Sequence, residues 1–267
     1  MPNYRIIDTH AHIFPGKIVE KAVASIGSFY SIPMEGRGTG PDLVNCGKKI
    51  GTERYVVHSV ATTPRQVRHI NDFIRYEMDR HPEFIGFMTL HPFMEGMHEE
   101  IERALEMGLC GVKLHPDFQE FNIDDERAME LYRAISGRAI LLLHMGDEFK
   151  DFSAPRRLAR VLDRFADLTV IAAHSGGYHA WEDSRKYLVG RNVYFDTSSS
   201  LFMLDAQEAA DMMHAHGMDK MLFGTDYPMW LHEEELARFL ALPLTEQERK
   251  QVLYDNAAAL RGISEEA

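Results

Sequence analysis

The stretch YRIIDTHAHIFPG, residues 4–16, is a short apolar run that ends in two histidines, His10 and His12. In a β-strand, residues i and i+2 project to the same side, so both imidazole rings would face one place. Two imidazoles side by side suit a metal ion, and they equally suit a hydrogen-bonded pair in a protein core. The pair alone leaves its role open, and the rest of the sequence has to decide.

Seven further apolar runs alternate with amphipathic segments along the chain. Together with residues 4–8, the predicted strands are 54–60, 84–90, 110–114, 139–143, 169–173, 193–197 and 220–224. Near-continuous apolar strands separated by helical segments indicate a parallel sheet covered by helices. Eight such units in 267 residues favour a closed (β/α)8 TIM barrel. An open, doubly wound sheet is the alternative, although no G-x-G-x-x-G follows the first predicted strand.

Helix signals recur along the whole chain and predict a single domain over residues 1–267. Thr63 is a predicted N-cap, with Pro64 at the first helical position and Pro82 beyond the end. Near the other end, Thr245 and Glu248 have the spacing of a capping box.

One segment interrupts the alternation of strands and helices. Residues 25–40 read SIGSFYSIPMEGRGTG, which is rich in Gly, Ser and Pro, and a short helix is predicted after it, over 41–51. Long loops in compact domains often line a binding site, so 25–40 is predicted to be a lid loop that carries Arg37. The alternative is a surface loop without a role.

Composition excludes several classes of protein. The 29 basic and 41 acidic residues give a net charge of -12, which argues against a nucleic-acid partner. The chain has only two cysteines, too few for a disulfide framework, so a reducing cytoplasm is expected. The apolar run near Met1 is too short for a signal peptide, and no run approaches the roughly 18 apolar residues of a membrane helix. The partner expected is a small-molecule substrate, and the oligomeric state stays open, a homo-oligomer included.

Histidines gather where the predicted strands end. Of the 14 histidines, seven fall at these carboxyl ends: His10, His12, His58, His91, His115, His144 and His174. In a barrel all carboxyl ends meet at one mouth, where catalytic residues lie. We therefore predict that these side chains converge and that His10 and His12 bind a metal.

Each of these residues also has a plainer interpretation. A lone histidine at a strand end is more often a hydrogen-bonded structural residue than a ligand, and Asp196 or Asp226 could cap the helix that follows it. Chance does not readily place His-x-His, His144, His174 and Asp226 on the first, fifth, sixth and eighth predicted strands. The combination favours a metal site over the plainer interpretations.

The ordered motifs resemble those of the metal-dependent amidohydrolase superfamily, in its amidohydrolase-related branch. They are DTHAH after the first strand, His144 after the fifth, AHSGG after the sixth, FGTDYP after the eighth and a late NAAAL helix. The resemblance covers nearly the whole chain and implies a distorted (β/α)8 barrel. By position, it implies that the metal is bound by His10, His12, His144 and Asp226. It makes His174 either a further ligand or the side chain that positions the attacking water.

Lys113 is the ambiguous member of this set. In two-metal members of the superfamily, a lysine on the fourth strand is carboxylated and the carbamate bridges the ions. Carbamate formation needs a neutral amine, and hence a lowered lysine pKa. The decarboxylase-like members that this chain resembles have one metal and no such bridge. One metal is therefore favoured, with Lys113 as a cation that holds a substrate carboxylate; two metals are the alternative.

The main prediction is a hydrolase that uses a metal-activated water. Imidazole and carboxylate ligands with an open position fit Zn²⁺, with Mn²⁺ or Fe²⁺ as alternatives. A bound metal lowers the pKa of water towards about 7, Asp226 would accept the water proton, and His174 would polarise the substrate carbonyl or orient the nucleophile. The candidates to hold a small anionic substrate are Lys113, His115, His58 and Arg37.

Three rival functions are left. The first keeps the metal but changes the reaction to nonhydrolytic decarboxylation or hydration of a small unsaturated carboxylic acid. The second is a Schiff-base aldolase that uses Lys113, which leaves His10, His12 and Asp226 unexplained. The third is a binding protein without catalysis, which fits poorly because no expected site residue is missing. A serine hydrolase is disfavoured because the sequence has no G-x-S-x-G elbow.

Overall fold

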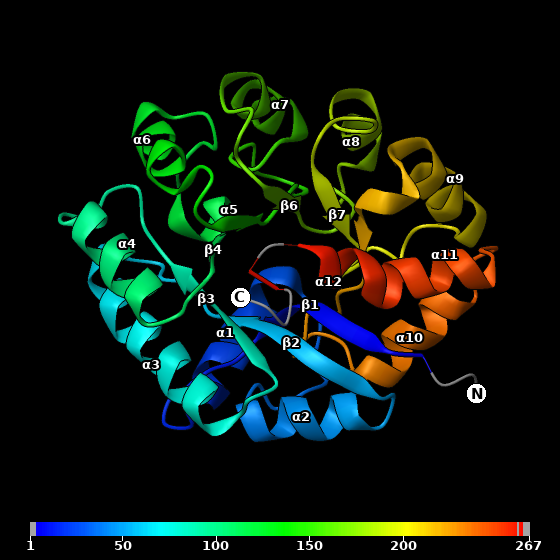
Figure 1. Ribbon diagram of the computed structural model, residues 1–267, viewed down its shortest axis with the longest axis horizontal. Helices are drawn as coiled ribbons and strands as arrows, with labels where there is room; N and C mark the ends of the chain where they lie inside the picture. Colours follow the sequence, from blue (N-terminus) through cyan, green and yellow to red (C-terminus); the bar gives the residue numbers. More distant parts are fainter. Residues whose placement is uncertain (1–3, 261, 264–267) are drawn as a thin grey trace.

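The computed structural model describes residues 4–260 and 262–263, and it forms a single ring of parallel strands surrounded by helices (Figure 1). The strands are β1 (Ile6–His12), β2 (Thr52–His58), β3 (Phe84–Thr89), β4 (Gly111–Leu114), β5 (Ile140–Leu143), β6 (Val170–Ala172), β7 (Tyr194–Asp196) and β8 (Met221–Leu222). Each strand pairs with the next one in parallel. The predicted (β/α)8 barrel and its eight strands are confirmed.

Helices occupy the connections between the strands. They are α1 (Val19–Tyr30), α2 (Gly40–Lys48), α3 (Val67–Arg80), α4 (Met97–Glu106), α5 (Pro116–Gln119), α6 (Glu126–Ile135), α7 (Pro155–Arg164), α8 (Trp181–Tyr187), α9 (Ala206–His216), α10 (His232–Leu240), α11 (Glu246–Lys250) and α12 (Asn256–Ala259). Short 3₁₀ turns precede α3 (Pro64–Gln66) and β8 (Met218–Lys220), and a π-turn joins α11 to α12 (Gln251–Asp255). The capping box predicted at Thr245 and Glu248 is present. Thr63 forms a second capping box, with Gln66.

One end of the barrel interior is apolar. Ile7, Val56 and Ile85, from the first three strands, are buried in one cluster with Ala257 and Leu260 of the last helical segment. These strand residues precede the histidines at the strand ends, so the 257–260 segment packs on the side of the interior away from them. One end of the barrel is thereby filled, and the polar strand ends are left at the other.

The barrel closes irregularly between β8 and β1. Strand β8 is only two residues long. Beyond it the chain continues along β1 through backbone hydrogen bonds: Thr9 N–H donates to Phe223 O (2.9 Å), Asp226 N–H to His10 O (2.8 Å) and His12 N–H to Tyr227 O (2.7 Å). This closure agrees with the distorted barrel that the family resemblance implied. It also places Asp226 beside His10.

Asp8 fastens this closure through its side chain. Its Oδ1 accepts the backbone N–H groups of His10 and Thr225, both at 3.0 Å. Its Oδ2 accepts the Thr225 hydroxyl at 2.7 Å and lies 3.0 Å from His232 Nε2. A single buried carboxylate therefore ties the end of β1 to the chain after β8.

Residues 25–30 of the predicted loop 25–40 are helical instead, because α1 extends through Tyr30, and the lid role stays a prediction. Gly and Ser lower the helix propensity of this stretch. However, Ile18, Ala22, Ile26 and Phe29 recur at helical spacing and all line the same cavity. That apolar face outweighs the propensity. The chain is irregular only after Tyr30, and α2 confirms the short helix predicted to follow.

No helix within the described residues is both long enough and apolar enough to cross a membrane.

Replacing Asp8 by Ala should lower the free energy of unfolding by about 3 kcal/mol or more, because two buried backbone N–H groups lose their acceptor. Urea unfolding of metal-free protein measures this without a contribution from metal binding. The control is Asp79→Ala, which removes an exposed helical ion pair with Arg75 and should change stability by about 0.5 kcal/mol or less. Equal midpoints for both variants and the wild type would show that Asp8 does not hold the closure.

Candidate metal centre

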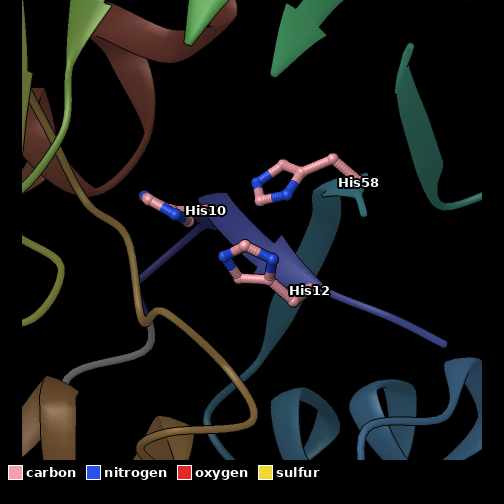
Figure 2. Close-up of side chains that lie close together, drawn as sticks. All are labelled: His10, His12 and His58. Atoms are coloured by element: carbon pink, nitrogen blue, oxygen red, sulfur yellow. The ribbon is translucent and has the colours of Figure 1, made fainter. Parts of the chain in front are cut away.

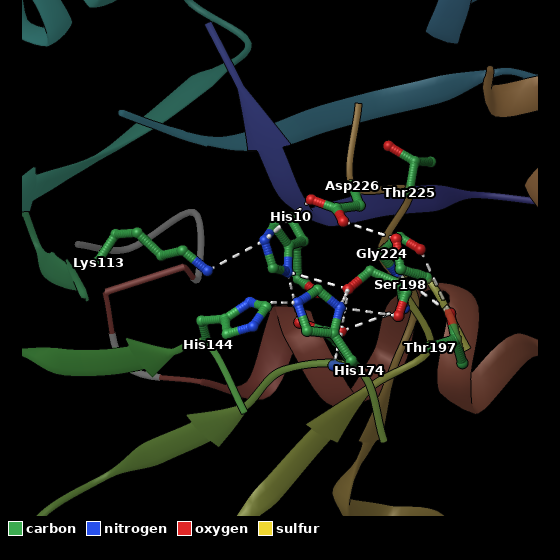
Figure 3. Close-up of polar contacts among 12 residues, drawn as sticks. His10, Lys113, His144, His174, Thr197, Ser198, Gly224, Thr225 and Asp226 are labelled. Atoms are coloured by element: carbon green, nitrogen blue, oxygen red, sulfur yellow. Dashed lines mark hydrogen bonds and ion pairs between the residues drawn. The ribbon is translucent and has the colours of Figure 1, made fainter. Parts of the chain in front are cut away.

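The predicted strand-end residues converge at one end of the barrel, and Figure 3 shows His10, Lys113, His144, His174 and Asp226 facing one another. The ring centroids of His10 and His174 lie 5.1 Å apart, and those of His144 and His174 lie 4.7 Å apart. The residues come from β1, β4 and the segments that follow β5, β6 and β8. The convergence predicted from the strand positions is present for these residues, whereas the ring of His91, which was predicted to join them, lies against Phe93.

His144 and His174 point unprotonated nitrogens at each other. His144 Nε2 donates to Gly146 O at 2.9 Å, and His174 Nδ1 donates to Ser198 O at 3.0 Å. In neutral rings the remaining nitrogens, His144 Nδ1 and His174 Nε2, carry lone pairs, and they lie 2.9 Å apart. Two lone pairs at this distance repel each other unless a cation or a proton lies between them. The arrangement fits two ligands of one metal ion.

The ring of His10 also presents an unprotonated nitrogen to the site. Its Nδ1 donates to Asp196 Oδ2 at 2.9 Å, which leaves the lone pair on Nε2. That Nε2 lies 3.5 Å from Asp226 Oδ1, and His12 Nε2 lies 3.4 Å from the same oxygen. A carboxylate oxygen and two imidazole nitrogens thus face a common point.

Asp226 is held by its other oxygen. Oδ2 accepts the Ser199 hydroxyl at 2.6 Å, and Ser199 Oγ in turn accepts Trp230 Nε1–H at 3.0 Å. Burial alone would raise the pKa of Asp226, but the neighbouring His10, His12 and His174 outweigh burial and hold that pKa well below the usual range. Asp226 is therefore an ionised carboxylate with one oxygen free to face a cation.

The backbone is strained at two of these positions. His174 has φ 60° and Asp226 has φ 57°, in the left-handed region that non-glycine residues seldom occupy. His174 N–H donates to Asp196 Oδ1 at 3.0 Å, and Asp226 N–H donates to His10 O. The surrounding hydrogen bonds hold both residues in this conformation, as is common where side chains must be aimed at a site.

The site histidines are neutral. Burial is the largest cause that lowers the pKa of each of these rings: His10, His12, His58, His115, His144 and His174. Neutral imidazole is the form that binds metals. The electrostatics of the site therefore favour the ligand state.

His58 was a candidate to hold substrate, and the structure places it behind the first two histidines (Figure 2). Its ring centroid lies 4.4 Å from that of His12 and 5.1 Å from that of His10. The ring is fully buried, does not line the cavity, and neither of its nitrogens has a hydrogen-bond partner among the described residues. Ligand atoms of these three histidines lie within 4.8 Å of one another, so His58 lies next to the predicted ligands and not against the cavity where substrate would bind.

Lys113 is fully buried, and its Nζ lies 3.1 Å from His10 Nε2. Burial lowers its pKa to about 8, partly offset by Asp226 and Asp196. The amine is thus still mostly cationic at neutral pH. It does not line the cavity, so it lies beneath the predicted metal position.

A cavity of about 1150 Å³ opens above these residues and is lined at its deep end by His12, His144, His115 and Asp226. Arg37 is exposed and is not part of this lining. Its backbone N–H donates to Asp42 Oδ2 at 3.0 Å, which anchors the segment while the side chain faces outwards. Of the four predicted substrate residues, only His115 borders the cavity.

Sequence reasoning missed the residues that orient the ligands. Asp196 was placed at a strand end with a helix cap as its one suggested role, but its carboxylate accepts the Nδ1–H of His10, the backbone N–H of His174 and both the backbone N–H and hydroxyl of Ser198. Its position at the end of β7 was the available signal. Ser199 and Trp230 carried no comparable signal, because their partners lie far away in the sequence.

Comparison with solved structures supports the fold. An uncharacterized TIM-barrel protein from Bordetella bronchiseptica shares 20% identity over 95% of this chain and 96% of its own, with a TM-score of 0.72. A second similar structure is a dihydroxybenzoic acid decarboxylase from Polaromonas sp. JS666, with bound manganese and the inhibitor 2-nitroresorcinol. It has 16% sequence identity over 96% of each chain, with a TM-score of 0.71. A probable 2-pyrone-4,6-dicarboxylic acid hydrolase from Acinetobacter baumannii shares 16% over 96% of this chain and 98% of its own, with a TM-score of 0.68.

No curated protein matches the sequence. The Amidohydro_2 family model, described as Amidohydrolase, matches residues 7–263. This match covers nearly the whole chain and includes every strand-end residue of the candidate metal centre. It confirms the resemblance inferred from the motifs, and the chain belongs to the amidohydrolase family.

Proposed function

We propose that the protein is a metal-dependent decarboxylase of a small unsaturated carboxylic acid. The lining of the cavity carries this proposal. Its apolar residues include Phe14, Ile26, Phe29, Phe118 and Met229, and charged residues such as Arg65 and Lys150 also line it. A flat carbon skeleton fits the apolar part of the walls, and basic side chains there are available to an acid.

The similar structures support this reaction more than hydrolysis. Several of them are named as decarboxylases, of 2,6-dihydroxybenzoate and of 5-carboxyvanillate among others. Hydrolysis, the main prediction from the sequence, is the second candidate, because one similar structure is named as a probable hydrolase, another as a putative amidohydrolase, and the family is described as Amidohydrolase.

We assign one divalent metal ion to the centre, with His10, His12, His144 and Asp226 as its ligands and His174 beside them. Imidazole nitrogens with one carboxylate suit Zn²⁺, Fe²⁺ or Mn²⁺. The manganese bound in a similar structure favours Mn²⁺ over the zinc expected from the sequence. When bound, the ion supplies Lewis-acid stabilisation of negative charge on substrate oxygens.

The chain's own residues bind the acid and carry the proton. Loss of carbon dioxide leaves an electron pair on carbon, and one proton must be delivered there. Asp226 Oδ1 and His174 Nε2 face the centre and are the candidates to carry that proton, which either group, unprotonated at neutral pH, would first take from water. Ser199 keeps Asp226 turned towards the site, and the Lys113 ammonium adds positive charge beneath it.

The reaction is tested with protein loaded separately with Mn²⁺ and Zn²⁺. We expect metal-dependent release of carbon dioxide from at least one acid in a panel that includes 2,6-dihydroxybenzoate and 5-carboxyvanillate. Chromatography would show the decarboxylated product in equal amount. Ring opening of 2-pyrone-4,6-dicarboxylate, with no carbon dioxide released from any acid, would contradict the decarboxylase and support the hydrolase.

Purified protein supplied with metal should hold close to one divalent ion per chain. His10→Ala and His12→Ala should each abolish tight binding, and they should lose the rise in thermal midpoint that the metal produces, because a ligand bound to the native state stabilises it by mass action. Elemental analysis and thermal melts measure both effects. His98→Ala, an exposed histidine on α4, is the matched control and should keep its metal.

Two outcomes contradict this metal assignment. Wild-type metal content in both ligand variants would remove His10 and His12 from the centre. Two ions per chain, with a carboxylated Lys113, would show that the lysine bridges metals instead of lying beneath one.

Asp226→Asn should retain the ion, but more weakly, because an amide keeps the shape and one oxygen. An amide cannot accept or carry a proton at neutral pH, so kcat should fall by about 10²-fold or more while KM changes less. Metal content and steady-state kinetics on the same preparation measure this, with the exposed Asp219→Asn as control. Full occupancy with near-normal kcat would transfer the proton-carrying role to His174.

A further inference from the structure

We propose that Tyr30 contacts the substrate, through a hydroxyl group that donates a hydrogen bond to an oxygen of the molecule in the cavity. This inference rests on the proposed function only in treating that cavity as the active site. From the 25–40 segment, the sequence had singled out Arg37, which faces away. Tyr30, at the end of α1, lines the cavity together with His115, His144 and Asp226.

The orientation of Tyr30 depends on His115, whose ring is fixed on both faces. The His115 ring stacks between two others. Its centroid lies 3.8 Å from that of Phe118, with 9° between the ring planes, and 3.7 Å from that of His144, with 10° between the planes. Its backbone N–H donates to Gln119 Oε1 at 2.9 Å. The ring therefore has little freedom to turn, and its Nε2 is aimed at Tyr30.

The hydrogen bonds of His115 identify which ring nitrogen carries the proton. The backbone N–H of Phe118 is shared between His115 O at 3.1 Å and His115 Nδ1 at 3.3 Å, and as an acceptor Nδ1 offers a lone pair. The ring proton is then on Nε2, which lies 2.8 Å from Tyr30 Oη. His115 is the donor in this contact, and the tyrosine oxygen is the acceptor.

The hydrogen of the Tyr30 hydroxyl is consequently not used in this contact. Among the described residues, His115 is the one hydrogen-bond partner of this hydroxyl. The Tyr30 ring is held edge-on against Tyr178, with centroids 5.4 Å apart at 79°, so the hydroxyl is fixed in place. Burial, with Asp226 and Asp117 adding to it, raises the pKa of Tyr30 well above its ordinary value, and the group stays a donor.

The occupant that this donor suits is an acid with an oxygen near its reacting carbon. A carboxylate or phenolate oxygen beside His144 and Asp226 would accept the Tyr30 hydrogen. The residue that supplies this hydrogen, Tyr30, is the last residue of α1, and no residue of that helix is fully buried. Substrate would thus complete a hydrogen-bond chain that runs from the Phe118 N–H through His115 and Tyr30.

The first test measures binding of 2-nitroresorcinol, the inhibitor found in a manganese-bound similar structure, to Mn²⁺-loaded protein. Tyr30→Phe removes only the hydroxyl, and we expect binding at least about 10-fold weaker, the scale of one hydrogen bond to a charged oxygen. Metal content should stay at the wild-type level. Tyr178→Phe is the matched control and should bind within about twofold of the wild type. Equal affinity in the wild type and Tyr30→Phe, including no binding in either, overturns the proposal.

The second test needs no ligand. Long-range ¹H–¹⁵N spectra of the zinc-loaded protein distinguish histidine tautomers, and the His115 signals are assigned by their loss in His115→Gln. We expect the proton on Nε2. A proton on Nδ1 would make Tyr30 the donor to His115 and would overturn the proposal, whatever the decarboxylation assay shows. With the proton on Nε2 and a tenfold effect of Tyr30→Phe, a failed decarboxylation assay would count against the reaction and not against Tyr30.

Discussion

The carboxylate of Asp196 determines how the candidate metal centre is arranged. It is fully buried at the end of β7, and it receives hydrogen bonds from the His10 ring and from the backbone of His174. The first bond fixes the His10 tautomer, and the second holds the strained backbone that aims His174. Without this acceptor, the His10 ring could present either nitrogen to the site, and the backbone that aims His174 would lose one of its hydrogen bonds.

Two buried acids have separate roles: Asp8 closes the barrel, and Asp196 orients side chains at the site. Asp8 joins the two ends of the strand ring, where a two-residue β8 is too short to close the barrel by a regular ladder. Asp196 orients rings that the closed barrel has already brought together. Fold closure and ligand orientation are therefore separate constraints, although both act on His10, through its backbone and its side chain respectively.

The strands were predictable because parallel strands buried on both faces are near-continuous apolar runs, and all eight were found. The histidines at the strand ends followed from that topology. The first turns of the 25–40 segment were not predictable in the same way, since Gly27 and the serines favour a loop while the apolar spacing that makes the helix starts at Ile18. Ring tautomers and the contacts of Ser199, Trp230 and Tyr30 could not be predicted, because each depends on a partner distant in sequence. Motifs shared by hydrolases and decarboxylases could not separate the two reactions.

The segment 257–260, buried against Ile7, Val56 and Ile85, has a consequence for biosynthesis. The first strands leave the ribosome roughly two hundred residues before the segment that fills the interior behind them. Until that segment has emerged, the apolar inner surfaces of β1 to β3 lack part of their packing. Domains generally fold as units during synthesis, and transiently exposed apolar surface promotes aggregation. The nascent chain therefore keeps part of this apolar surface uncovered late in translation, even though most of its strands are already made.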